Sequence, residues 1–293
     1  MKFKIFNIIF FITIVLASGQ TKVEDWYEKF ILVENIPKSY EVKKYILNTN
    51  ELYGVDKKIE VYNIFTNTNS IILISTLPSL KGSNNWEKID INKIKNKILT
   101  ESEIKKFQAE RYQNNSPDSK TLKYGIIKKV NNEYYVPIHC LTEYFTISDY
   151  KYPLIPAYGT ININTTPVSI KDMEKSYSDQ FPNQEFPLDV RKYPGWFDYK
   201  TYARNYLSKK IKLGGFDAYQ FWTMDGWRVI DGYNVNRGID RFVYIPTKGI
   251  VGGSYDFYFW YLQGANKNNK AIVNMLWDNI INEKIMIAEE LKL

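Results

Sequence analysis

Short runs of β-branched and aromatic residues, separated by Asn, Gly and Asp, constrain the fold of this sequence more than any other feature. Runs of this composition between turn-forming residues are typical of β-strands. They occupy 40–47, 59–65, 70–77, 122–130, 133–138, 216–224, 227–231, 241–245 and 255–262. Asn131-Asn132 and Asp225-Gly226 each separate two runs by the two residues of a tight hairpin turn, so we expect these neighbouring strands to pair antiparallel.

The last of these runs, 255–262, is expected to be a central strand. From 257 to 262 both alternating sets of its side chains are apolar, which is typical of a strand that is buried on both faces. Two glycine-containing segments before it, Thr247-Lys248-Gly249 and Gly252-Gly253-Ser254, have the composition of turns.

Apolar residues at helical spacing predict helices in other parts of the chain. These segments are 23–33, 91–98, 100–107, a helix beginning at Ser169, 199–211 and a long helix over 269–293. Thr100 with Glu103, and Ser169 with Asp172, have the spacing of capping boxes. The sequence therefore predicts an α+β fold, with a largely antiparallel sheet or sheets, packed helices and a long C-terminal helix.

Residues 1–19 have the three-part pattern of a cleaved signal peptide. Lys2 and Lys4 precede the apolar stretch 5–17, and Ala17-Ser18-Gly19 supplies small residues at a cleavage site. A membrane anchor is the alternative, but the apolar stretch is shorter than the ~20 residues that span a bilayer. We therefore expect a bacterial protein that is exported to the periplasm or secreted, with a mature region over 20–293. We expect no stable membrane span after cleavage.

The mature region forms one domain or two. Pro182, Pro187 and Pro194 fall close together in the segment 182–196, and prolines at this density make an ordered helix improbable. The segment is either a domain boundary or a long loop within one domain.

Charge argues against nucleic acid as a partner. The chain has 39 basic and 32 acidic residues and a formal net charge of +7, and the basic excess is spread over both halves. Nucleic-acid binding requires basic residues gathered on one face or arm. We expect no nucleic-acid partner.

The chain has a single His and a single Cys, which removes most familiar catalytic and metal sites. Zinc sites built from His and Cys need several such ligands. His139 and Cys140 are adjacent in a strand-like run, so they are expected to point to opposite faces and not to cooperate as a dyad. We expect a buried thiol without a disulfide partner, no metal, no cofactor and no identifiable catalytic residue.

The segment 214–264 is the most distinctive part of the chain. It holds most of the chain's 15 glycines and a high density of aromatic residues. Five Asp residues also lie in it, at positions 217, 225, 231, 240 and 256. Flat aromatic rings beside carboxylates can bind sugar rings, or hydrolyse a glycosidic bond. The candidate ligand-binding residues are Trp222, Trp227, Arg228, Asp231 and Tyr233.

Three functional hypotheses follow. The first is an exported, non-enzymatic protein that binds a glycan or an envelope protein through these hairpins. The alternative is a carboxylate-dependent glycan hydrolase. The third is an interaction protein of the envelope without a small-molecule site, because aromatic and Asp residues at these positions also suit a buried core and its turns.

Overall fold

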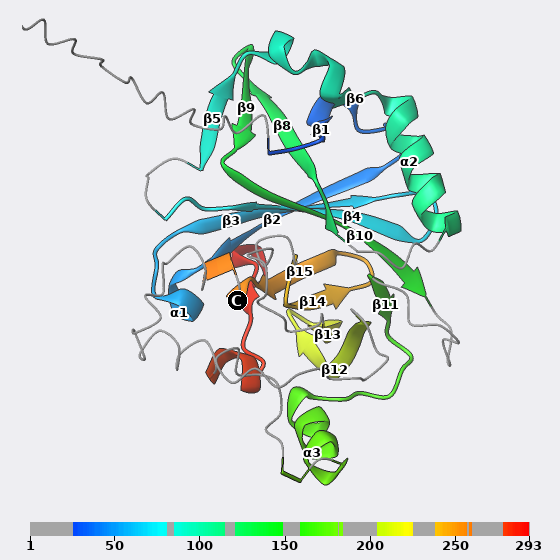
Figure 1. Cartoon of the computed structure of the whole chain (residues 1–293), viewed down its shortest axis with the longest axis vertical. Coiled ribbons are helices and arrows are strands. Elements are labelled where there is room, and N and C mark those ends of the chain that lie inside the picture. The colour runs from blue at the N-terminus through cyan, green and yellow to red at the C-terminus, as the bar shows by residue number, and fades with distance from the viewer. Residues whose placement is uncertain are drawn as a thin grey trace, which may run out of the picture.

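Three stacked β-sheets make up the protein in the computed structural model (Figure 1). The structure describes residues 26–80, 85–114, 121–148, 159–180, 182–183, 204–224, 238–256, 258–259 and 278–292. The central sheet crosses the middle of the molecule, one sheet lies above it and another below it.

The central sheet has the strand order β11-β10-β4-β3-β2. These strands are β2 (Glu41–Asn48), β3 (Lys58–Phe65), β4 (Ser70–Leu77), β10 (His139–Ser148) and β11 (Thr160–Asn162). The short strand β7 (Thr121–Leu122) also pairs with β10. Every residue of β4 is buried, because sheets cover both of its faces. The strand therefore carries apolar residues in both alternating sets.

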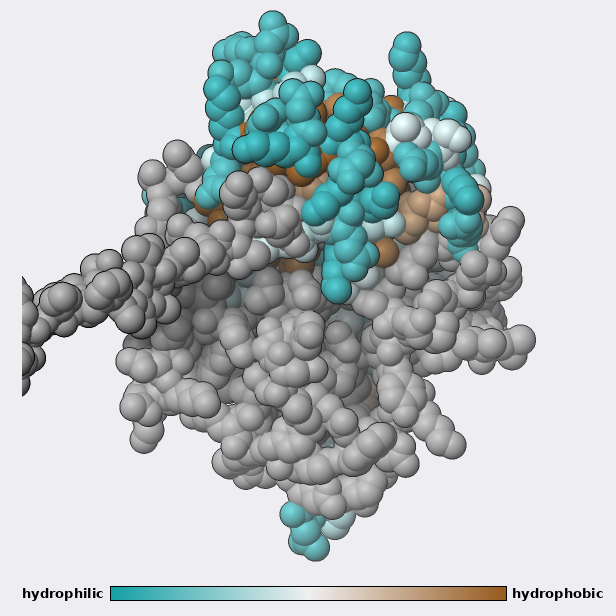
Figure 2. Space-filling view, turned by 45° about the horizontal axis from the view of Figure 1, so that its top comes forward, coloured by the Kyte–Doolittle hydropathy of each residue, from teal (hydrophilic) through white to brown (hydrophobic). Residues whose placement is uncertain are grey.

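The upper sheet has the strand order β5-β9-β8-β1-β6. Its strands are β1 (Lys29–Leu32), β5 (Trp86–Ile89), β6 (Ile98–Leu99), β8 (Tyr124–Val130) and β9 (Glu133–Pro137). The β8–β9 hairpin turns at Asn131 and Asn132, whose φ angles are 49° and 63°, which confirms the predicted turn. The helix α2 (Glu101–Asn114) lies beside this sheet. On the upper part of the molecule, hydrophilic side chains dominate the coloured surface and hydrophobic residues are visible between them (Figure 2).

The lower sheet has the order β12-β13-β14-β15-β16. Its strands are β12 (Arg204–Leu213), β13 (Phe216–Met224), β14 (Arg241–Ile245), β15 (Gly249–Ser254) and β16 (Met286–Ile287). Short elements complete the described fold: α1 (Asn50–Tyr53), α3 (Ile170–Gln180), and 3-10 turns at 33–35, 91–93, 95–97 and 289–291. The central and lower sheets are joined at one edge, where Leu47 of β2 forms a bridge with Ala288 just after β16.

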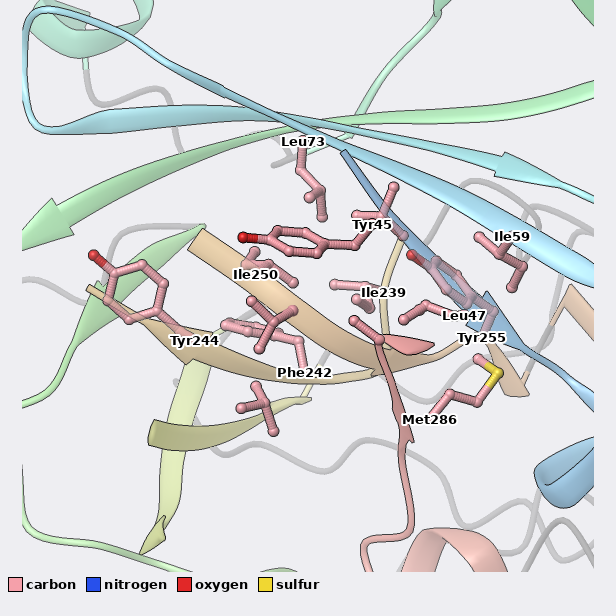
Figure 3. Close-up of a cluster of buried hydrophobic side chains, with 14 of the residues drawn as sticks. Tyr45, Leu47, Ile59, Leu73, Ile239, Phe242, Tyr244, Ile250, Tyr255 and Met286 are labelled. Atoms are coloured by element: carbon pink, nitrogen blue, oxygen red, sulfur yellow. The ribbon is translucent and has the colours of Figure 1, made fainter. Parts of the chain in front are cut away.

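Each pair of facing sheets encloses its own hydrophobic core. The core between the central and lower sheets includes Leu73, Phe242 and Ile250, and it is shown in Figure 3. The core between the central and upper sheets includes Ile72 and Ile74. Successive residues of β4 therefore enter different cores, as expected for a strand whose side chains alternate between faces.

The predicted α+β class is wrong, because β-strands dominate the described residues and helices are few and short. The predicted long helix over 269–293 does not continue through its described part, where only 278–281 are helical. Helical residues end at 281, Glu283 has a φ angle of 50°, and β16 follows. The segment 23–33, predicted as a helix, instead contains β1 and the first residue of a 3-10 turn. The segment 199–211, also predicted as a helix, belongs to β12 in its described part.

The turn predicted at Gly252-Gly253-Ser254 is wrong, and the close approach of neighbouring chain segments explains why glycines occur there. Gly252 and Gly253 were expected in a turn, but they lie in the buried strand β15. A Cβ atom on Gly252 would lie 2.5 Å from the carbonyl oxygen of Met286, and one on Gly253 would lie 2.2 Å from Ile239 Cδ1. These glycines let two neighbouring segments pack against the strand. The predicted strand 255–262 is also wrong in its described part, since Asp256, Tyr258 and Phe259 are helical.

The two predicted capping boxes are confirmed. Thr100 Oγ1 accepts a hydrogen bond from the Glu103 amide at 3.3 Å, and Glu103 Oε2 accepts one from the Thr100 amide at 2.8 Å. Ser169 and Asp172 exchange the same pair of hydrogen bonds at the start of α3. Each box satisfies two amides that the first helical turn leaves unpaired.

Candidate functional site

Trp222 is the only residue of the predicted ligand surface that lies in the described part of the chain, and it is buried. Its indole is 1% exposed, stacks on Tyr206 at a ring distance of 4.7 Å, and donates a hydrogen bond from Nε1 to the carbonyl oxygen of Val168 at 2.8 Å. This indole therefore stabilises the lower sheet. The other four residues, Trp227, Arg228, Asp231 and Tyr233, lie outside the described residues.

The aspartates of the segment 214–264 have different environments. Asp217 is exposed and forms an ion pair with a lysine across the β12–β13 hairpin. Asp240 and Asp256 are buried side by side, and the Asp256 amide donates a hydrogen bond to Asp240 Oδ2 at 2.6 Å. The aspartates at 225 and 231 lie outside the described residues. The described aspartates thus include one buried pair and no exposed pair.

The buried aspartates belong to a polar group that we call the Arg241 cluster, formed by Tyr53, Asp240, Arg241 and Asp256. Arg241 Nη1 lies 2.5 Å from Asp256 Oδ2, and both side chains are 2% exposed. Tyr53 Oη donates to Asp256 Oδ1 at 3.1 Å, and Arg241 Nε donates to the carbonyl oxygen of Lys284 at 3.1 Å. Burial raises the pKa of Tyr53 well above its usual value, so the phenol stays protonated.

This cluster has the properties of a structural ion pair. Its side chains link α1, β14 and the residues after β15, and the guanidinium neutralises the Asp256 carboxylate. A buried charge is tolerated when it is paired and hydrogen-bonded. A general acid or base must reach a substrate, and these side chains are almost completely enclosed.

His139 and Cys140 lie on opposite faces of β10, as predicted. Cys140 enters the upper core, where burial raises the pKa of its thiol to about 12. His139 instead contacts Tyr258, whose side chain belongs to the lower core. The two side chains therefore cannot form a nucleophile–base pair, and the thiol is unreactive in the folded protein because thiolate is the reactive form.

His139 is the middle of three aromatic rings that we call the Trp26 platform. The Trp26 indole stacks on the imidazole with a ring distance of 5.4 Å and an interplanar angle of 21°. Tyr258 meets the imidazole edge-on at 5.5 Å, and its hydroxyl donates to the carbonyl oxygen of Pro78 at 2.7 Å. Trp26 is 43% exposed, whereas Tyr258 is 2% exposed. An exposed indole is thus held in place by a support that reaches into the core.

The imidazole of this platform is neutral at pH 7. Burial lowers the pKa of His139 below the usual value of 6.5. A neutral ring presents no charge to a ligand on Trp26, so the platform is an aromatic surface and not a cationic one.

Trp86, another partly exposed indole, has a different environment. Lys128 Nζ lies 3.6 Å from the centre of its ring and 3.7 Å from Glu60 Oε1. Glu60 also pairs with Lys44 at 2.7 Å and accepts a hydrogen bond from Tyr62 at 2.5 Å. Burial by itself would raise the pKa of Glu60, but the hydrogen bonds with Lys44 and Tyr62 outweigh it, so the pKa is lowered. One face of Trp86 is therefore occupied by a cation of the protein itself.

The described residues provide no other obvious centre of chemistry. Among them there is no group of three or more His, Cys, Asp or Glu side chains that could hold a metal ion. No helix in the described ranges is both long and apolar enough to cross a bilayer.

Comparison with known proteins gave no relative: no family model, no curated protein and no solved structure matches the chain.

Sequence reasoning missed the Trp26 platform. Trp26 lies in the segment 23–33, whose apolar spacing predicts a helix, and His139 lies in a strand-like run. Their contact joins two segments far apart in the chain, and no local pattern predicts it.

Proposed function

We propose that the protein is an exported, non-enzymatic binding protein whose ligand stacks on Trp26. One observation carries the proposal: a 43% exposed indole is fixed by stacking on a partly buried imidazole. An indole that moves freely loses conformational entropy when a ligand orders it. Stacking on His139 already orders Trp26 before binding, so this entropy cost does not reduce the affinity for the ligand.

A glycan is the ligand class that best suits this surface. Sugar rings present flat faces of C–H groups, which pack on the π-face of Trp. The neutral His139 behind the indole adds no charge, which suits an uncharged ring better than an acidic or basic ligand. An envelope protein that offers an apolar side chain is the other partner compatible with the same surface.

The hydrolase alternative receives less support from the described carboxylates. Hydrolysis of a glycosidic bond requires two carboxyl groups on either side of the substrate. The buried carboxylates instead bind the protein itself: Asp256 pairs with Arg241, Glu143 accepts a hydrogen bond from the Ile239 amide, and Glu283 accepts one from the Ile170 amide.

Binding to a glycan array, followed by titration with the best glycan, tests the proposal. Trp26→Ala should weaken binding about tenfold or more, because a stacked ring contributes on the order of 1.4 kcal/mol. Phe216→Ala is the matched control, since Phe216 is also an exposed aromatic residue but lies on the lower sheet. Equal affinities of wild type and Trp26→Ala would overturn the assignment of the ligand to the platform.

Export is tested separately by mass spectrometry of protein recovered after secretion. Cleavage after Gly19 should leave Gln20 at the N-terminus. Detection of an intact N-terminal leader on the recovered protein would contradict the proposed processing.

A further inference from the structure

The second half of β2 is covered at the edge of the central sheet. β2 is the last strand of this sheet and pairs with β3 on one side. On its other side, Leu47 forms the bridge with Ala288, and the Ile46 amide donates a hydrogen bond to Glu290 Oε2 at 3.3 Å. The segment after β16 therefore closes this edge from Ile46 onward.

The first half of the same edge is open. The pairing of β2 with β3 has no register shift, and the amides of a strand point alternately to its two sides. Because the Ile46 amide points away from β3, those of Val42 and Lys44 do so too. Among the described residues, neither amide has a hydrogen-bond partner on this side. Glu41 and Val42, which lie on opposite faces of β2, are both exposed, so neither neighbouring sheet covers the edge here.

Three residues at this open edge have a self-complementary pattern. Glu41 and Lys43 lie on one face of β2, on either side of Val42, and their side chains pair at 3.1 Å. Val42 lies on the other face, opposite Ile64 of β3, and is 41% exposed. Two antiparallel copies of β2 that meet at Val42 would place the Glu41 of each copy opposite the Lys43 of the other. Cross-strand pairs of opposite charge stabilise a sheet, and the two valines would face each other.

We infer that two copies of this chain pair through the open edge of β2 and continue the central sheet across a two-fold axis. The axis passes beside Val42, whose amide and carbonyl oxygen bond to those of the other copy. A register centred on Lys43 would instead place two lysines directly opposite each other, which is unfavourable. This inference does not depend on the proposed function of Trp26.

The charges at this edge distinguish it from a protected edge. Charged side chains, lysine above all, commonly prevent an edge strand from pairing with another chain. β12, the edge strand of the lower sheet, has this property, because its segment 209–213 carries three lysines and no acidic residue. A second copy would be repelled there. At β2 the charges on either side of Val42 have opposite signs, so a second copy is attracted in the antiparallel register.

Sedimentation velocity over a series of protein concentrations tests this inference. The wild type should form a dimer as the concentration rises toward about 1 mM, at which even weak contacts associate. Glu41→Lys should weaken dimer formation about tenfold or more, because two attractive cross-strand pairs become repulsive. The double variant Glu41→Lys/Lys43→Glu restores both attractive pairs and should associate like the wild type.

A mixture of two single variants tests the register. Glu41→Lys places two lysines beside Val42, and Lys43→Glu places two glutamates there, so each variant should repel its own copy. When the two variants are mixed, they should form a heterodimer, because every cross-strand pair then joins a lysine to a glutamate.

Oxidation of Val42→Cys gives an independent measurement. Facing residues of a hydrogen-bonded antiparallel pair have Cα atoms about 5.5 Å apart, which is within the range of a disulfide. Mild oxidation should therefore link two copies of this variant. Val130→Cys is the matched control, since Val130 is also an exposed valine but lies at the end of β8. Cys140 is buried and should not react.

Three results would overturn the inference. The first is a monomer at every concentration of the series. The second is a dimer that Glu41→Lys does not weaken, or that the mixed variants do not form. The third is equal cross-linking of Val42→Cys and Val130→Cys. Trp26→Ala should form the dimer like the wild type, so this inference and the proposed glycan binding can fail independently.

Discussion

The central sheet meets its two neighbours in different ways. Toward the upper sheet, β4 presents the apolar side chains Ile72 and Ile74. Toward the lower sheet, Asn63, Ser75 and Glu143 are each fully buried and form hydrogen bonds with lower-sheet segments. Apolar contacts are non-directional, whereas buried hydrogen bonds fix one relative position. Hydrogen bonds also reach the upper sheet, where Thr142 Oγ1 of β10 donates to the carbonyl oxygen of Tyr124 in β8 at 2.7 Å. The lower interface differs because its buried polar groups include an amide, a hydroxyl and a carboxylate, each with a partner in a lower-sheet segment.

Disruption of the Arg241 cluster should cause the largest loss in the free energy of unfolding. Arg241→Leu leaves the Asp256 carboxylate buried without its cation, and we expect a loss of about 3–5 kcal/mol in the free energy of unfolding. Urea denaturation measures it. The double variant Arg241→Leu/Asp256→Leu should recover much of the loss, because it removes both charges. A double variant as unstable as the single one would contradict this account.

Asn63→Leu should have the next largest effect. The Asn63 side chain donates to the Ile250 carbonyl oxygen at 2.9 Å and accepts from the Ile250 amide at 2.7 Å. Leucine leaves both buried backbone groups unpaired, at a cost of about 3 kcal/mol. The same denaturation measurement applies, with Asn85→Leu at the periphery of the upper sheet as the comparison. If Asn63→Leu lowers the free energy of unfolding less than Asn85→Leu does, the buried hydrogen bonds of the lower interface are not a major source of stability.

Two substitutions on β4, at positions three residues apart whose side chains enter opposite faces, compare the two faces directly. Ser75→Ala leaves the buried Tyr255 hydroxyl without its partner at 2.6 Å, and should cost about 1–3 kcal/mol. Ile72→Val removes one methylene group from the upper core, and should cost about 1 kcal/mol. The contrast between the faces disappears if Ile72→Val proves to be the more destabilising of the two in the same buffer.

The smallest expected effect is a dependence of stability on pH from His139. Burial lowers the pKa of His139 below 6.5 in the folded state, so the unfolded chain binds this proton at a higher pH. Stability should therefore fall as the pH decreases through about 6.5. His139→Gln should reduce the slope of unfolding free energy against pH between 7 and 5. An identical slope in the variant would show that the imidazole is not buried in this way.

Strands could be predicted from the sequence wherever their side chains alternate regularly and turn residues bound them. The runs 216–224 and 241–245 match β13 and β14. β12 was predicted as a helix because its pairing with β13 shifts between Leu207 and Lys209. A bulge of this kind interrupts the two-residue period, and the remaining apolar spacing resembles that of a helix.

Long-range contacts account for the other errors. In β1, Phe30 and Ile31 are both fully buried, and β1 pairs in parallel with both β6 and β8. A strand buried on both faces has no alternating pattern, so it resembled part of a helix. The Trp26 platform likewise depends on His139, which is far from Trp26 in the sequence and begins β10 of the central sheet. No local periodicity indicates such a contact.

The bridge between Leu47 and Ala288 has a consequence for the order in which the chain can fold. The same edge brings Ile46 and Glu290 together across 244 residues of sequence. A chain that emerges N-terminus first from a ribosome or a translocation channel cannot complete this edge until its late segment is free. Non-local pairing of this kind slows folding. The edge of β2 is therefore covered only after the residues around 288 have been made, so this edge is among the last parts of the described fold to close.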